Sequence, residues 1–188
     1  MPAPACLFLT HGAGSDRNHS SLVALEERLA PLPVERVDFP YRTEGRRFPD
    51  RAPKLIEFVK ETSSAAAAAA GIREDQIVLG GRSLGGRICS MAVAAGLPAA
   101  GLLLVCYPLH PPNKPENLRV DHFEAINVPC LFVSGNRDPF GSPEEFASYL
   151  PNIKGPVTTV WLPGARHDLA GQDGPICDAV AEWITTLT

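Results

Sequence analysis

Short apolar runs alternate with longer amphipathic stretches along almost the whole chain. Most of the short runs are hydrophobic at consecutive positions, which is typical of parallel strands that are covered by helices on both faces. They lie at residues 5–10, 34–39, 76–80, 101–106, 129–134 and 157–162. We expect each run to form a strand of one mainly parallel sheet.

The stretches between these runs have the periodicity and capping residues of helices. They lie at residues 20–30, 52–70, 84–96, 115–125, 143–150 and 173–187, and the weakest pattern is that of 115–125. Strands and helices that alternate with short connections form doubly wound sheets. The pattern therefore predicts a single α/β domain over residues 1–188, with about six strands, helices on both faces and no cap domain.

Composition narrows the range of partners. The chain has 188 residues, a size that suits one domain, with 17 Lys and Arg against 21 Asp and Glu, a net charge of −4. This balance provides no excess of positive charge that would attract nucleic acid or anionic lipid. Residues 88–109 carry no formal charge, but Gly96, Pro98, Gly101 and Pro108 divide them into a helix, a turn and a strand. We therefore expect neither a nucleic-acid partner nor a membrane span.

Cysteine usage indicates a reducing compartment. The five cysteines are odd in number, lack C-x-x-C spacing and lie mostly inside apolar runs. The chain start, MPAPACLFLTHG, has no basic segment before its apolar run, unlike a secretory signal. We expect free, buried thiols and a cytoplasmic protein.

The predicted strands are followed by unusually polar segments, at the edge of the sheet where ligands bind in open α/β folds. One of them, Gly81-Arg82-Ser83-Leu84-Gly85, matches G-x-S-x-G between a strand and a helix. In that context the serine stands on a sharp turn with its hydroxyl exposed, and small neighbours let strand and helix approach. We predict that Ser83 is a nucleophile. The alternative is a capping serine at a glycine-rich helix start.

A serine nucleophile needs a base, and the base needs an acid that orients it. In this type of fold the chain order is serine, acid, histidine. Asp138 follows the fifth predicted strand and His167 follows the sixth, so they are our acid and base. The alternatives left open are His110 as the base and Asp38 or Asp168 as the acid.

Acyl transfer also needs hydrogen-bond donors for the developing oxyanion. The N–H of Leu84 lies directly after the nucleophile at a helix start, and the N–H of Ala13 lies in the glycine loop after the first strand. We predict these two amides as the oxyanion hole. His11 and His110 are predicted as pocket residues, and no metal site or cofactor is expected.

The segments THGAG, GGRSLGG, GNRDPFG and GARHDL resemble those of the α/β-hydrolase superfamily. Together with YPLHPPNKPENLR, they are most similar to the small dienelactone-hydrolase-like branch that includes testis-expressed and NSL-complex-subunit hydrolase-like proteins. The resemblance implies an α/β-hydrolase fold and the triad Ser83, Asp138 and His167.

These features together predict a serine hydrolase that cleaves small carboxylic esters through an acyl-enzyme, acting as a monomer or homodimer on a small-molecule substrate. Two alternatives stay open: a vestigial, hydrolase-shaped binding or scaffold protein, and a thioesterase or amidase with the same triad. A separate hypothesis concerns the arginine-rich loop at residues 42–51, which could recognise an anionic group.

Overall fold

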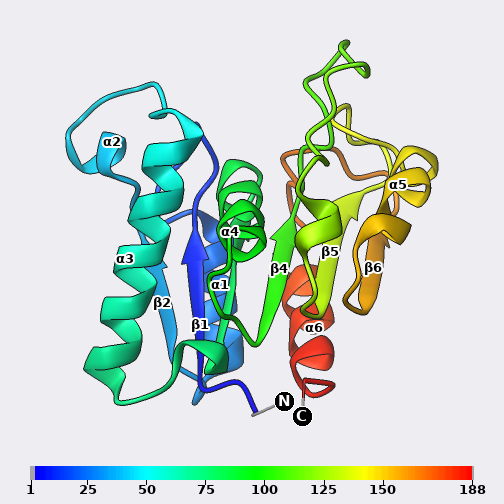
Figure 1. The fold of residues 1–188 in the computed structure, drawn as a ribbon. Helices are drawn as coiled ribbons and strands as arrows, with labels where there is room; N and C mark the ends of the chain where they lie inside the picture. The colour runs from blue at the N-terminus through cyan, green and yellow to red at the C-terminus, as the bar shows by residue number, and fades with distance from the viewer. Residues whose placement is uncertain (1–2, 188) are drawn as a thin grey trace.

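The computed structural model describes residues 3–187 and contains one sheet of six parallel strands (Figure 1). The strand order is β2-β1-β3-β4-β5-β6. The strands are β1 Cys6–Thr10, β2 Val34–Val37, β3 Ile77–Arg82, β4 Gly101–Val105, β5 Cys130–Gly135 and β6 Val157–Leu162. The predicted six-stranded, parallel α/β fold is confirmed. Its extension over the whole of residues 1–188 stays a prediction.

α-Helices connect successive strands, except between β4 and β5. The α-helices are α1 Ser20–Leu29, α2 Pro40–Thr43, α3 Ala52–Ala70, α4 Leu84–Ala94, α5 Pro143–Tyr149 and α6 Asp173–Ile184. Short 3₁₀ turns occur at Glu74–Gln76, Phe123–Ala125 and Leu150–Asn152. Ser142 caps α5 reciprocally with Glu145, as the sequence around Pro143 indicates.

The sheet separates two hydrophobic clusters. Phe8 of β1 and Ile88 of α4 belong to the cluster beneath α3 and α4. Leu7 of β1, Leu25 of α1 and Val180 of α6 belong to the cluster on the opposite face. Neighbouring residues of β1 thus point to opposite faces, and both faces are buried, which accounts for the continuous apolar runs in the central strands.

The helix predicted at residues 115–125 is wrong. Only Phe123–Ala125 forms a 3₁₀ turn there. In the middle of this segment, the backbone N–H of Arg119 donates to the carbonyl oxygen of Leu109 and its carbonyl oxygen accepts from the Tyr107 hydroxyl, so neither group is available for a helix. The segment is a long loop that leaves β4.

The strand predicted at residues 34–39 ends two residues early, at Val37. The backbone N–H of Phe39 donates to Nε2 of His11 at 3.1 Å. The chain therefore leaves the sheet edge at this point and enters the short helix α2, which begins at Pro40.

Two further predictions are confirmed. All five cysteines are free and buried. The uncharged stretch at residues 88–109 is divided between α4 and β4. Within residues 3–187, no helix combines the length and apolar character that crossing a bilayer requires.

The order of the strands sets the position of the site. From β1 the chain first forms β2 on one side of β1. It then crosses to the other side of β1 to form β3, and β4, β5 and β6 follow in that direction. In open α/β sheets, ligands bind outside the carboxyl ends of the strands at such a reversal. The arrowheads of β1, β4 and β5 point toward that edge in Figure 1.

Candidate active site

Ser83 stands between β3 and α4 in a strained backbone conformation, with φ 50° and ψ −111°. A positive φ is uncommon for a residue with a side chain and is typical of functional turns. Glycine is required beside it, because a Cβ atom at Gly81 or Gly85 would collide with the carbonyl group of Thr10 in β1. The glycines let β1, β3 and α4 approach closely.

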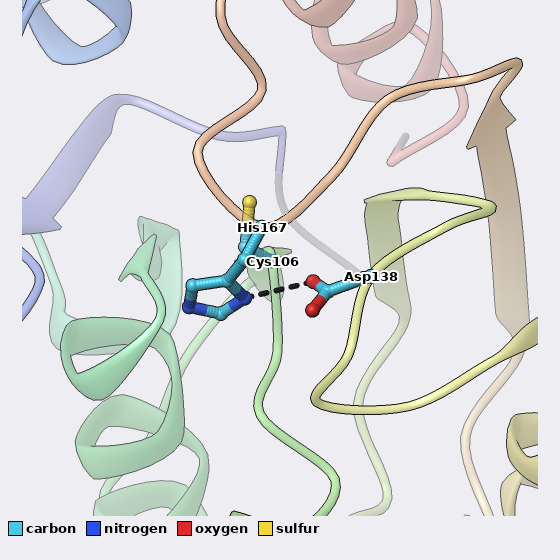
Figure 2. A group of neighbouring side chains, drawn as sticks. All are labelled: Cys106, Asp138 and His167. Carbon is cyan, nitrogen blue, oxygen red and sulfur yellow. Dashed lines mark hydrogen bonds and ion pairs between the residues drawn. The ribbon is translucent and has the colours of Figure 1, made fainter. Parts of the chain in front are cut away.

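A continuous hydrogen-bonded chain joins the three residues that the sequence predicts as a triad. Oγ of Ser83 lies 2.9 Å from Nε2 of His167, and Nδ1 of His167 lies 2.8 Å from Oδ2 of Asp138. Figure 2 shows the His167 ring and the Asp138 carboxylate facing each other, each from a separate loop. This arrangement can carry a proton from the serine hydroxyl to the imidazole.

The surroundings hold the acid and the base in place. Asp138 is 6% exposed, and its second carboxylate oxygen accepts a hydrogen bond of 2.8 Å from the backbone N–H of Phe140. The ring of Phe140 stacks on that of His167, with 3.9 Å between centroids. The imidazole is thus fixed at one face and at both nitrogens.

Arg82, next to the serine, holds the loop that carries the histidine. Its Nη2 atom donates to the carbonyl oxygens of His167 and Asp168, at 2.8 and 2.7 Å. The charged donor ties the end of β3 to the loop after β6, so residues that are 85 positions apart keep a fixed separation.

The alternative base, His110, lies in a different environment. Its ring is buried, with Nδ1 2.9 Å from the carbonyl oxygen of Pro111 and Nε2 3.2 Å from a carboxylate oxygen of Glu145. Both nitrogens are therefore occupied away from Ser83. His110 joins the loop after β4 to the first turn of α5.

The two alternative acids also have other partners. Asp38 accepts a hydrogen bond of 2.7 Å from the backbone N–H of Arg17, and Asp168 accepts one of 3.4 Å from that of Ala170. The carboxylate that contacts His167 is that of Asp138.

The glycine loop after β1 is held from beneath by His11. The carbonyl oxygen of Gly12 lies 2.7 Å from Nδ1 of His11. It also accepts a hydrogen bond of 3.2 Å from the backbone N–H of Ser15. Because the N–H and C=O of a trans peptide point in opposite directions, the Ala13 N–H points away from these contacts. The N–H of Leu84, at the first position of α4, has no intrahelical acceptor. The oxyanion hole formed by these two amides stays a prediction.

His11 itself is neutral. Its Nε2 accepts from Phe39, so the proton resides on Nδ1, and burial lowers its pKa.

A cavity of about 730 Å³ opens beside Ser83. It is lined by the loop after β1, the start of α4 and the loops that follow β4, β5 and β6. The lining residues are Gly12, Ala13, Gly14, Ser15, His19, Arg82, Ser83, Leu84, Arg87, Pro108, Arg119, Pro139, Phe140, Arg166, His167 and Asp168.

His11 and His110, which the sequence predicts as pocket residues, are not among these lining residues. Both side chains are instead occupied in hydrogen bonds that support loops. Sequence reasoning missed the four lining arginines and His19. Arg82 and Arg166 directly precede Ser83 and His167 in the sequence, and this position could have identified them as residues near the site. Arg119 lies far along the loop after β4, and nothing in the sequence indicated that it lines the cavity.

Cys106, Asp138 and His167 bring ligand-type atoms within 4.8 Å of one another (Figure 2). Two of these residues are already hydrogen-bonded to each other. Burial raises the pKa of Cys106 to about 12, so its sulfur is a neutral thiol and a poor metal ligand. The donor set fits an oriented imidazole better than a metal centre.

Comparisons with known proteins agree on the fold. A family model described as an alpha/beta hydrolase domain matches residues 3–174. Est1E from Butyrivibrio proteoclasticus superimposes with a TM-score of 0.77 at 16% identity, covering 98% of this chain and 88% of that one. A dienelactone hydrolase from Anabaena variabilis gives 0.75 at 17% identity, with 98% and 87% covered. RedJ-thioesterase from Streptomyces coelicolor gives 0.70 at 19% identity, with 99% and 91% covered.

Proposed function

The chain belongs to the alpha/beta hydrolase family, and from this premise we propose that it is a serine hydrolase that cleaves small carboxylic esters through an acyl-enzyme on Ser83. The observation that carries the proposal is the hydrogen-bonded chain from Ser83 through His167 to Asp138. Fold alone does not imply an activity, so the argument rests on this geometry and on the cavity beside it.

In the proposed reaction, Oγ of Ser83 attacks the ester carbonyl carbon while its proton moves to Nε2 of His167. The N–H groups of Ala13 and Leu84 donate to the oxyanion that forms. The tetrahedral intermediate then collapses, and the bond between the carbonyl carbon and the oxygen of the leaving group breaks. His167 donates its proton to that oxygen, so the leaving group departs as an alcohol. Water then attacks the acyl-enzyme by the same route, releasing the carboxylic acid and restoring the Ser83 hydroxyl.

Asp138 has an orienting role in this scheme. Its carboxylate accepts a hydrogen bond from the Nδ1–H of His167, which leaves Nε2 free to accept the proton of Ser83. It also stabilises the imidazolium that forms during attack.

Covalent labelling with a fluorophosphonate, read by intact mass, tests the proposal. We expect the wild type to gain one probe adduct, because an activated serine displaces the fluoride, and Ser83→Ala and His167→Ala to gain none. Ser15→Ala is the matched control, since Ser15 lies in the same cavity lining. It should still be labelled.

Turnover of 4-nitrophenyl acetate completes the test. We expect Ser83→Ala to reduce kcat by about 10⁴-fold or more, with an unchanged circular dichroism spectrum. A folded wild type that neither labels nor turns over would favour a binding or scaffold protein instead.

A further inference from the structure

The cavity beside Ser83 is strongly cationic, although the chain as a whole has a net charge of −4. Its lining contains four arginines, whereas Asp168 is the one carboxylate among the described lining residues. The arginines are Arg82, Arg87, Arg119 and Arg166. A cleft lined by one sign of charge attracts ligands of the opposite sign.

These arginines lack carboxylate partners. Within residues 3–187, none of the four has a carboxylate oxygen within 4.0 Å. Arg82 is only 6% exposed, yet its Nη1 atom has no hydrogen-bond partner among the described residues, and neither has the buried Nε atom of Arg87. A buried donor without an acceptor is costly, so such groups call for a ligand or another explanation.

Two of the arginines are held near each other. Arg87 lies on the first turns of α4, and Arg119 lies in the loop after β4. Burial and the positive charge of Arg87 both lower the pKa of Arg119. The backbone of Arg119 is anchored on both sides, since its carbonyl oxygen accepts the Tyr107 hydroxyl at 2.6 Å and its N–H donates to Leu109 at 2.9 Å.

This anchoring keeps two like charges beside the nucleophile instead of letting the loop carry Arg119 away. An anion bound between them would remove the repulsion and supply the missing acceptor. Arg82 is less available for this role, because its Nη2 atom is already used by the loop of His167.

We propose that Arg87 and Arg119 bind a carboxylate or phosphate group of the substrate, so that the esters cleaved at Ser83 carry a negative charge. This inference rests on the proposed hydrolase function and names its substrate class. The guanidinium groups of both residues are specificity determinants, and the triad carries out the bond cleavage.

Matched esters test the proposal. Mono-4-nitrophenyl glutarate and 4-nitrophenyl pentanoate have acyl chains of the same length and the same leaving group, and only the first is anionic. We expect the wild type to have at least about a tenfold higher kcat/KM for the glutarate ester. A parallel pair, 4-acetoxybenzoate and phenyl acetate, places the charge on the leaving group and identifies which side of the ester the arginines face.

Substitutions assign the effect to the two arginines. Arg87→Gln with Arg119→Gln should lower kcat/KM for the preferred anionic ester by about 100-fold and leave that for its neutral match within about twofold. The double Lys variant keeps the charges and should recover part of the loss. The double variant Arg47→Gln with Arg51→Gln is the control, because it removes the same two positive charges from exposed residues outside the cavity lining. It should change neither value.

A binding arm separates this proposal from the proposed function. Calorimetry with glutarate and, separately, with inorganic phosphate measures anion binding without catalysis and distinguishes the two anions. If the wild type cleaves no ester but binds one of them, and the Gln double variant does not, the anion site stands and the hydrolase proposal fails. If the wild type cleaves neutral esters as well as anionic ones and binds neither anion, the inference is overturned.

Discussion

Two groups of arginines in this chain meet opposite surroundings. In the loop at residues 42–51, Arg46 contacts Glu44 and forms a bidentate ion pair with Asp50, with N···O distances of 3.0 and 2.9 Å. In the cavity, four arginines line a space of about 730 Å³ without a carboxylate partner among residues 3–187.

The difference shows that a cluster of arginines in the sequence does not by itself mark an anion site. The sequence suggested the loop, because its arginines are adjacent along the chain. In the loop, Glu44 and Asp50 pair with Arg46, and exposed pairs of this kind contribute little to stability. The cavity arginines are brought together from separate elements, and none of them is ion-paired to a carboxylate of residues 3–187.

The largest contrast between the two regions is expected from one isosteric change made in each. Asp138→Asn should lower kcat by about 10⁴-fold, because an amide stabilises the wrong tautomer of His167. Asp50→Asn, in the loop, should leave kcat within about twofold. Ester turnover measures both, with circular dichroism as the check on folding. Equal losses would mean that the carboxylate beside His167 has no special role.

A smaller contrast is expected from two arginines. Arg82→Met removes both hydrogen bonds to the carbonyl oxygens of His167 and Asp168 and should lower kcat by about 10-fold to 100-fold with little change in KM. The reason is that His167 loses the tie that sets its distance from Ser83. Steady-state kinetics separates the two constants.

The matched change in the loop, Arg46→Met, removes only exposed ion pairs. It should affect neither constant. A comparable fall in kcat in that variant would contradict the difference drawn between the two regions.

The smallest contrast concerns acid stability. Burial lowers the pKa of His122, in the loop after β4, from 6.5 to about 4, and also lowers those of His11 and His19. The unfolded chain therefore binds more protons than the folded protein below about pH 6.5, so the free energy of unfolding should decrease as the pH is lowered from about 6.5 to about 4. Urea unfolding at several pH values measures this.

The loop at residues 42–51 should contribute in a different range. Its hydrogen bond from Arg46 lowers the pKa of Asp50 below 3.8, so that stabilisation is present above pH 3.8 and is lost only as the pH falls through the lowered value. His122→Gln should reduce the slope between pH 6.5 and 4, and Arg46→Gln should leave it unchanged. The reverse result would contradict the assignment.

Much of the fold could be predicted from local patterns. The central strands are buried on both faces, so their apolar runs were unambiguous, and the capping residues around Pro143 located α5. Predictions failed where tertiary contacts decide. Phe39 leaves the sheet to bond His11, and the proline-rich segment after β4 is held as a loop by Tyr107.

By itself, the sequence determined the parallel α/β fold and the chain order of Ser83, Asp138 and His167, because strand ends in such a sheet meet at one edge. Only the tertiary structure decided which histidine contacts the serine, that His11 and His110 support loops, and that Arg87 and Arg119 share the cavity. The physical reason is that hydrophobic periodicity specifies burial along one element. Contacts between loops that lie 30 or more residues apart depend on how the elements pack.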